Sequence, residues 1–377
     1  MRFTTTMAAL ATAWVAACSG PGGSDGGAEC VPLTGTVVDA GSPEPTDVPF
    51  DLVPVELPVS DGGTIPVGVR FAIQLGIGAA GTIPAWLDTG SAGIQILQQS
   101  VSSAVLDDLQ TLGSETLTEE FEGGLEATGV VAMASITLGD RVTPVPIPIL
   151  LIQSVSCAPG FPCQDESAPL ESTIFNGFPA IVGIGMRSLA TTPALGNPIA
   201  QLPGQPDFIV KAPSFGGDAG TLRIGPTAAE VADYQLLQLE PLGPSSPTGD
   251  LRLSNCTPVW NDAAVPVCVD DQTGKTDYCA DGLLDTGSVL TFIEWQGYSG
   301  PDSFASGTSV QVSVGPSGSP TAQFDVTVSA SPQAGLDLFG ILPSTVGENL
   351  INLGTTLFFR YDVYFDQASG QIGLLAH

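Results

Sequence analysis

A short motif occurs once in each half of this chain, and both copies break an apolar segment at an aspartate. The first copy is Ala85-Trp-Leu-Asp-Thr-Gly-Ser91 and the second is Gly282-Leu-Leu-Asp-Thr-Gly-Ser288. An apolar run follows each copy, at 94–97 and at 289–293. Internal similarity of this kind is typical of repeated structural units. The chain is therefore predicted to fold as two related halves, each with one carboxylate at the end of a strand.

The residue types in the motif suit a carboxylate that must be held rigidly. A glycine lets the backbone bend and approach another segment closely, and the threonine and serine hydroxyls can fix the orientation of the carboxylate. Two such turns placed face to face would bring two carboxylates into contact, where they share one proton. The ionised member can then deprotonate a water while the protonated member donates to a substrate carbonyl. We predict that Asp88 and Asp285 are this catalytic pair.

A single Asp-Thr-Gly is more often an ordinary turn, in which the aspartate accepts hydrogen bonds from its own backbone. Here each copy is followed later by an apolar segment that contains or ends in glycine, at Ala180–Gly185 and at Leu350–Gly354. The catalytic interpretation therefore depends on the repeat and not on either motif alone. The predicted supporting residues around the pair are Thr89, Gly90, Ser91, Thr286, Gly287 and Ser288.

Short apolar runs bounded by turn residues fill the rest of the chain. The 377 residues include 46 Gly and 32 Pro, and Val, Ile, Thr and Leu recur between them. This pattern is typical of many short strands joined by turns, so it predicts an all-β fold. Short helices are predicted at 102–112 and 227–232.

The charge balance excludes several classes of function. The 39 acidic residues outnumber the 9 Lys and Arg, so no basic patch can neutralise the phosphates of a nucleic acid. The single histidine is His377, so Ser-His-Asp, Cys-His and multi-histidine metal sites lack their parts. The acidic segment 270–277 does not have the spacing of an EF-hand, and we interpret it as a solvated loop and not as a calcium site. We expect no cofactor and no bound metal.

The first residues resemble an export signal. Arg2 precedes a brief apolar run at 7–17 that is too short for a permanent membrane span. The segment Val15-Ala-Ala-Cys18 resembles the lipobox of bacterial lipoproteins, and an ordinary signal peptide that contains a cysteine is the alternative. We expect a signal peptide at 1–17 and a lipidated Cys18 with a flexible tether over 18–49. The lipid would be the chain's only membrane contact, in the bacterial envelope at the outer membrane or cell surface.

Six further cysteines form an even set, which favours disulfides in an exported chain. The short separations of Cys157 from Cys163 and of Cys268 from Cys279 would close a small loop and staple a hairpin. Cys30 and Cys256 remain, and they are paired by elimination only. Zinc is disfavoured because close Cys-x-x-Cys pairs and histidine ligands are absent from the sequence.

From about residue 65 to the C-terminus, the chain resembles the pepsin family of aspartic peptidases. Besides the two Asp-Thr-Gly-Ser turns, the resemblance is carried by Val67–Gly78, Gly220–Gly225 and the tail Asn352–Ala376. It implies two mainly antiparallel β-lobes with a cleft between them, which we place at 50–213 and 214–377. It also implies that Gly183 and Gly354 support the two catalytic turns, and that a disulfide joins Cys268 to Cys279.

The chain departs from this family at the flap, a hairpin that normally carries a tyrosine over the cleft. No tyrosine precedes Tyr234, and Gln95 stands where the family has a tryptophan. The flap is predicted at 118–129, with Phe121 nearest to the position of the missing tyrosine and Gly123 and Gly124 beside it. Phe121 could equally be a core residue, and both interpretations stay open.

Two other departures concern control and specificity. Residues 19–69 contain no Lys or Arg, so the basic propeptide of secreted family members has no counterpart. The turn Ser91-Ala-Gly-Ile94 is closer to exported bacterial proteins of uncharacterised function than to digestive enzymes. The resemblance therefore carries no substrate preference to this chain.

Taken with the intact aspartates, the resemblance implies an aspartic endopeptidase that acts on extended peptide or protein substrates. We expect it to be a monomer. A catalytically silent binding or surface lipoprotein of the same fold is the alternative, because fold alone does not fix function. The missing flap tyrosine favours this alternative. A peptidase restricted to one envelope partner is a third hypothesis.

Overall fold

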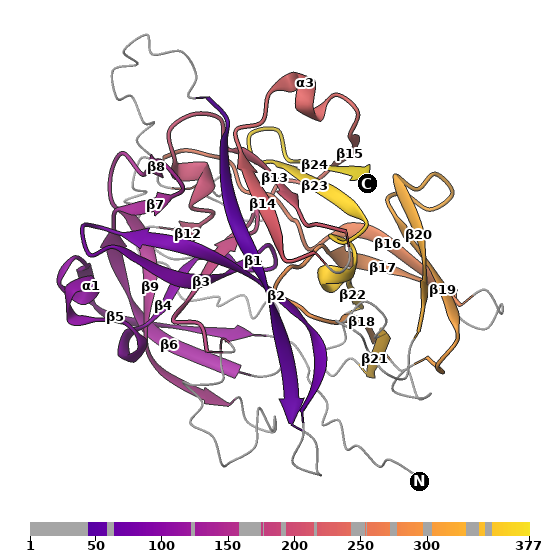
Figure 1. Ribbon diagram of the computed structural model, residues 1–377, viewed down its shortest axis with the longest axis horizontal. Helices are drawn as coiled ribbons and strands as arrows, with labels where there is room; N and C mark the ends of the chain where they lie inside the picture. The colour runs from indigo at the N-terminus through magenta and orange to yellow at the C-terminus, as the bar shows by residue number, and fades with distance from the viewer. Residues whose placement is uncertain are drawn as a thin grey trace, which may run out of the picture.

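Strands dominate the chain, which confirms the predicted all-β fold class. The computed structural model describes residues 44–58, 64–121, 125–157, 175, 177–189, 194–214, 217–242, 253, 255–271, 277–296, 304–328, 339–343 and 349–377. Within these residues the strands form two large sheets and one short strand pair (Figure 1).

The larger sheet begins in the first half of the chain and is completed by its last strands. Its strand order is β15-β24-β23-β13-β14-β1-β2-β3-β10-β4-β9-β6-β5, and β7 and β8 attach beside β2. The bounds are β1 Thr46–Pro58, β2 Thr64–Ile77, β3 Thr82–Asp88, β4 Ala92–Leu97, β5 Gln110–Phe121, β6 Leu125–Ala134, β7 Ile136–Leu138, β8 Arg141–Val142, β9 Ile147–Cys157, β10 Ala180–Ile184, β13 Asp207–Lys211, β14 Ala219–Ile224, β15 Gln235–Gln238, β23 Tyr361–Asp366 and β24 Gln371–Ala376. Strands from both predicted lobes therefore share this sheet.

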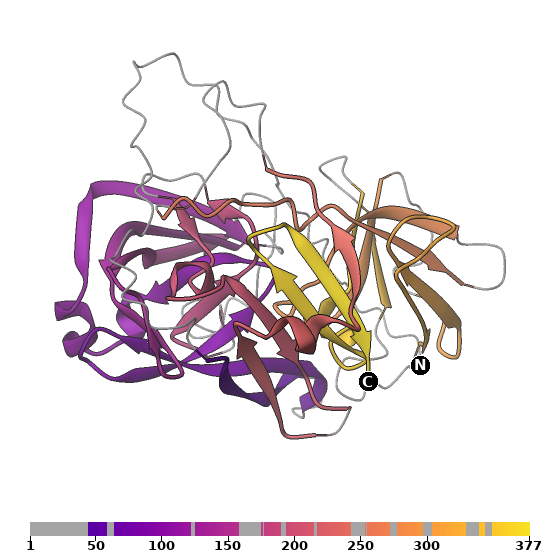
Figure 2. The same cartoon turned by 90° about the horizontal axis from the view of Figure 1, so that it is seen from above.

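The smaller of the two large sheets belongs to the second half of the chain and has the order β20-β19-β16-β17-β22-β18-β21. Its bounds are β16 Val265–Asp270, β17 Asp277–Leu283, β18 Thr291–Trp295, β19 Ser309–Val314, β20 Ala322–Thr327, β21 Phe339–Pro343 and β22 Leu350–Asn352, and the short pair is β11 Ser188–Leu189 with β12 Leu195–Gly196. In Figures 1 and 2 the purple and magenta strands lie at one end, the orange strands lie at the other, and the yellow C-terminal strands lie between them.

One three-strand arrangement occurs in both large sheets and is the structural counterpart of the repeated motif. In the larger sheet, β10 lies between β3, to which it is parallel, and β4, to which it is antiparallel. In the smaller sheet, β22 lies in the same way between β17 and β18. Every residue of β4 and β10 is buried, as expected for continuous apolar strands covered on both faces. A residue at the end of such a strand is therefore held by a rigid, buried backbone.

The main apolar core extends across both large sheets. Alternate residues of β2 enter it, as the period of a strand requires, and its side chains include the fully buried Phe71. The Phe71 ring stacks on Phe50 at 4.7 Å between centroids and meets Phe358 edge-on at 6.1 Å. These contacts join the first strands of the chain to the segment that precedes β23.

Each predicted helical segment contains a short helix with a side-chain N-cap. Helix α1 (Ser103–Asp107) follows Ser102, and α3 (Ala228–Val231) begins with a capping box between Thr227 and Glu230. The first helix ends before residue 112 because 110–112 belong to β5. The 3-10 turns are η1 Gln98–Ser100, η2 Ile199–Gln201 and η3 Gly354–Thr356. In the described part of the chain, no helix has the length and apolar character needed to span a membrane.

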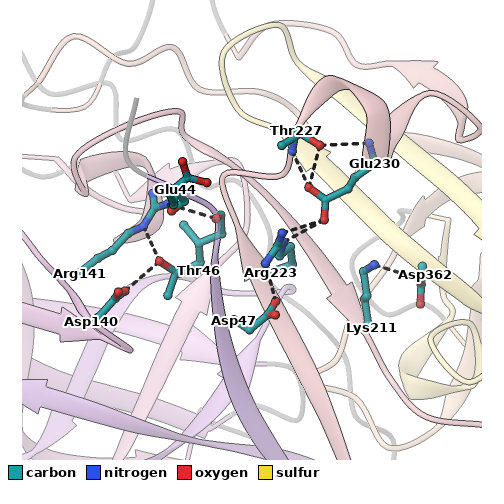
Figure 3. Close-up of polar contacts among 11 residues, drawn as sticks. Glu44, Thr46, Asp47, Asp140, Arg141, Lys211, Arg223, Thr227, Glu230 and Asp362 are labelled. Atoms are coloured by element: carbon teal, nitrogen blue, oxygen red, sulfur yellow. Dashed lines mark hydrogen bonds and ion pairs between the residues drawn. The ribbon is translucent and has the colours of Figure 1, made fainter. Parts of the chain in front are cut away.

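Charged side chains fix the start of β1 (Figure 3). Arg141 donates to Oγ1 of Thr46 at 3.0 Å and to the carbonyl oxygen of Glu44 at 2.7 Å. Arg223 lies between Asp47 at 3.2 Å and Glu230 at 2.9 Å. The Arg223 contacts are partly exposed, and exposed ion pairs contribute little to stability.

Candidate active site

The two aspartates of the repeated motif lie where the two large sheets meet. Asp88 is the last residue of β3, and Asp285 follows β17. The two glycines expected to support these turns occupy matching places. Gly183 of β10 is in register with Asp88, and a Cβ on Gly183 would lie 2.6 Å from the carbonyl oxygen of Gly93. Gly354 follows β22 with φ +54°, and a Cβ there would collide with the backbone after the second turn.

The threonines after the two aspartates lock the turns together. The backbone N–H of Thr89 donates to Oγ1 of Thr286 at 2.9 Å, and the N–H of Thr286 donates to Oγ1 of Thr89 at 2.9 Å. Each hydroxyl then donates across the contact, to the carbonyl oxygens of Leu284 at 2.7 Å and of Leu87 at 2.8 Å. Both threonines are fully buried, so this symmetric exchange is shielded from water. It fixes the two turns face to face.

The glycines of the motif allow the carboxyl groups to approach. The N–H of Gly90 donates to Oδ1 of Asp88 at 2.7 Å, and the N–H of Gly287 donates to Oδ1 of Asp285 at 2.6 Å. A Cβ on Gly90 would collide with the Asp285 carboxyl, and a Cβ on Gly287 would collide with the Asp88 carboxyl. Any larger residue at either position would therefore push the pair apart.

The outer oxygens of the pair have different partners in the two halves. Oδ2 of Asp88 accepts a hydrogen bond from Ser91 at 2.5 Å. Oδ2 of Asp285 instead accepts from the amide of Asn352 at 2.7 Å. The hydroxyl of Ser288 is bonded to the backbone of Leu290. Sequence reasoning assigned this supporting role to Ser288 and missed Asn352. In the sequence, Asn352 could have been noticed as a polar residue within the apolar run of β22.

Removing the Asn352 donor is expected to shift the pH dependence of activity. A hydrogen bond to a charged group stabilises it by about 1.5–3 kcal/mol, and this bond favours the state in which the pair carries a negative charge. We expect Asn352→Leu to raise the acid-side apparent pKa of kcat by about 1 unit or more. Ser288→Ala is the control, since its hydroxyl does not contact the pair, and it should leave the profile in place. Equal shifts in both variants would contradict this assignment.

Burial and mutual repulsion favour a shared proton. Asp88 and Asp285 are 4% and 6% exposed. Burial, followed by the charge of Asp285, raises the pKa of Asp88, and the hydrogen bonds from Ser91 and Gly90 oppose this shift only in part. A hydrogen-bonding interaction with the Asp285 carboxyl also raises the pKa of Asp88, as expected where two carboxyl groups share one proton. One acid and one base can therefore coexist in this site near neutral and acidic pH.

Two arginines that were not predicted from the sequence hold the carbonyls of the two Asp-Thr-Gly turns. Arg70 of β2 donates to the carbonyl oxygen of Gly287 and lies over the Trp86 ring, 3.6 Å from its centroid. Burial lowers the pKa of Arg70 to about 10, although the charges of Asp88 and Asp285 raise it. Arg187, which follows β10, donates to the carbonyl oxygen of Gly90. In the sequence, each of these arginines could have been noticed as a rare cation within an apolar segment.

Arg187 is part of a buried ion pair between the two halves of the chain. Its guanidinium lies 3.3 Å from Oδ1 of Asp262, and both side chains are almost completely buried. Oδ2 of Asp262 accepts from the backbone N–H of Met186 at 2.6 Å. The pair therefore fixes the segment after β10, which also packs against the first Asp-Thr-Gly turn.

The predicted flap segment lies on a hairpin formed by β5 and β6, which are paired from Phe121 and Leu125 back toward Gln110. Phe121 packs on an apolar cluster around Trp86, and its ring meets Phe175 edge-on at 5.9 Å. Phe121 is half-buried at the edge of this cluster, and its flap and core interpretations both stay open. The flap candidates Gly123 and Gly124 lie outside the described residues.

One predicted disulfide is present among the described residues. Cys268 and Cys279 are bonded, at opposed positions of β16 and β17, which confirms that pair. Cys157 and Cys256 are each in a disulfide as well. Their predicted partners Cys163 and Cys30, and the predicted lipidation site Cys18, lie outside the described residues.

No family model matches this chain. A search of curated proteins found no match either. The function must therefore be argued from the geometry of the site. In the part of the chain that the structure describes, no three His, Cys, Asp or Glu side chains gather in a way that could hold a metal ion.

The buried acids predict how stability depends on pH. Burial is the first cause that raises the pKa of Asp88 and Asp207, and it raises the pKa of Glu119 to about 8. Such groups keep their protons in the folded state at pH values where the unfolded chain has lost them. Their stabilisation is therefore complete below about pH 4 and is lost as pH rises through the folded pKa values.

We expect the melting temperature to fall by more than about 4 °C, equivalent to roughly 1–2 kcal/mol, between pH 5 and pH 8.5. Repulsion among the many acidic residues acts in the same direction. Glu230 does not change this trend, because hydrogen bonds from Thr227 lower its pKa and its stabilisation is already complete above about pH 5. Thermal unfolding across this range is the measurement, and a melting temperature that rises with pH would contradict the prediction.

Proposed function

We propose that this chain is an aspartic endopeptidase with a pepsin-like fold, in which Asp88 and Asp285 activate a water. The observation that carries the proposal is the reciprocal exchange between Thr89 and Thr286, because it holds two buried carboxyl groups in hydrogen-bonding contact. Rigid support of this kind suits chemistry that needs an acid and a base in one place. The resemblance of the repeated motif and of the tail to the pepsin family points the same way.

The proposed reaction uses the shared proton twice. The ionised aspartate takes a proton from water as the water oxygen bonds to the carbonyl carbon of the peptide, while the protonated aspartate donates to the carbonyl oxygen. This gives a neutral tetrahedral gem-diol. An aspartate then donates a proton to the amide nitrogen, the C–N bond breaks, and the diol returns a proton as a carboxyl group forms. The amine and the acid leave, and one proton remains on the pair.

The test is incubation of the purified chain with denatured protein at about pH 3 to 6, near and below the ordinary carboxyl pKa values. New N-termini should appear, and a statine-type inhibitor should prevent them. Binding of the inhibitor without cleavage would favour the alternative, a silent binding protein of the same fold. Cleavage confined to one protein of an envelope extract would favour a peptidase restricted to one partner.

We also propose that Cys18 carries a lipid that anchors the chain to the bacterial envelope. Small residues directly before this cysteine, behind an apolar run, support the proposal. Cys18→Ala is expected to abolish fatty-acid labelling and to move the chain from the membrane fraction to the soluble fraction. An unchanged mature mass and membrane fraction would contradict it.

A further inference from the structure

Glu119 is an acid at an inward-facing position of the β5–β6 hairpin. Its neighbours two residues away, Leu117 and Phe121, both pack on the apolar cluster around Trp86. Because side chains alternate along a strand, Glu119 points to the same face. Its cross-strand partner is the fully buried Ala127. An acid in this setting needs a polar partner to offset its burial.

Charged and polar groups of the catalytic region surround this carboxyl. The charge of Asp88 reaches it from the end of β3 and raises its pKa, and the charge of Arg187 reaches it from the segment after β10 and lowers it. Gln95 of β4 also lowers it. On the hairpin itself, the paired Glu120 and Glu126 lie one residue away on the opposite face. Burial is the largest effect and raises the pKa of Glu119 to about 8.

The polar atoms at this place are not satisfied within the chain. Gln95 is completely buried, and among the described residues its only polar neighbour that acts on it is the Glu119 carboxyl, with which its amide makes a hydrogen bond of poor geometry. Oε2 of Glu119 is buried without a well-formed hydrogen bond. Unsatisfied buried polar atoms are rare in folded proteins and call for a water or a ligand. Here the Glu119 and Gln95 side chains, next to Asp88, have hydrogen-bonding capacity that the chain itself does not fill.

We propose that Glu119 is a substrate-binding residue, which in its neutral form donates a hydrogen bond to the backbone of a peptide lying at the Asp88/Asp285 pair. Gln95 is the positioning residue that orients the Glu119 carboxyl. A peptide group offers both a donor and an acceptor, so it can form the hydrogen bonds that Glu119 and Gln95 do not form within the chain. This inference rests on the proposed function for the nature of its ligand, but peptide binding tests it without catalysis.

The experiment measures the Kd of a fluorescein-labelled casein peptide for the full chain carrying Asp285→Asn, from pH 6 to pH 9. With Glu119 present, Kd should rise about tenfold as the carboxyl ionises around pH 8. Adding Glu119→Gln keeps a donor that does not titrate, so Kd should stay nearly constant. Adding Glu119→Leu should raise Kd about tenfold at pH 6, as the loss of one hydrogen bond predicts. Glu120→Leu, on the opposite face, is the matched control and should leave Kd unchanged.

In the enzyme with both aspartates, Glu119→Leu should raise KM about tenfold and change kcat far less, as expected when a binding contact is lost. Unchanged Kd in Glu119→Leu together with a higher melting temperature would show a merely buried acid and overturn the inference. Weakened binding confined to Lys- or Arg-containing peptides would also overturn it, because that would be charge recognition. If peptide binding depends on Glu119 but the chain with both aspartates never cleaves a peptide, the proposed peptidase function is contradicted and this inference is still supported. If Glu119→Leu does not fold, the pH dependence of Kd, compared between chains with Glu119 and with Glu119→Gln, still tests the inference.

Discussion

Asp88→Asn and Asp285→Asn are each expected to lower kcat by at least about 10²–10⁴-fold, the usual contribution of a general acid or base. Asparagine keeps the size of the side chain but can neither take a proton from water nor share one with its partner. The Thr89 and Thr286 exchange that holds the turns does not involve the carboxyl groups, so both variants should stay folded.

Cleavage of denatured protein at acidic pH is the measurement, with thermal unfolding as the check on folding. Asp362→Asn is a suitable control, because Asp362 pairs with Lys211 and His377 and does not contact the catalytic turns. Turnover close to that of the unmodified chain in either catalytic variant would show that the pair does not perform the reaction.

Arg187→Met is expected to destabilise the fold by about 3–5 kcal/mol, because it leaves the carboxylate of Asp262 buried without its cation. The variant also removes the donor to the carbonyl of Gly90. The midpoint of urea unfolding measures the effect. Arg223→Met removes a partly exposed arginine with two acidic partners and should cost at most about 1 kcal/mol.

The double variant Arg187→Met with Asp262→Asn tests the reason for this loss. Replacing the stranded charge by a neutral amide should recover part of the stability. Equal losses in Arg187→Met and Arg223→Met, or no recovery in the double variant, would show that the buried charge is not the cause.

The repeated motif was enough to predict that the turns of Asp88 and Asp285 lie face to face. It worked because the motif combines a strand end, a turn and a carboxylate, and all of these are local properties. The helix predicted at 102–112 was too long because its end is set by contacts with a distant segment and not by local properties. Gln110 pairs with Met133 of β6, so strand pairing overrides the local preference of its segment.

The residues that sequence reasoning missed are placed by contacts between distant segments. Arg70 and Gly287 are separated by 217 positions, and Asn352 and Asp285 by 67. Glu119 resembles any other acid of a solvated hairpin until β5 is known to turn that position inward. A polar residue in an apolar run can mark such a position, but its partner cannot be read locally, because that contact depends on how the sheets pack.

The position of the last strands determines when this site can exist during synthesis. Asn352 and Gly354 come from the end of the chain, and β23 must pair with β13 while β24 pairs with β15 to finish the larger sheet. Pairing across such separations is slow, because the long loops it closes must be ordered first. A chain that is still emerging therefore has Asp88 in place without its partner. Assembly of the pair therefore waits until the residues of β22 to β24 have been made, which under the proposed function would keep an emerging chain from cleaving itself or its neighbours.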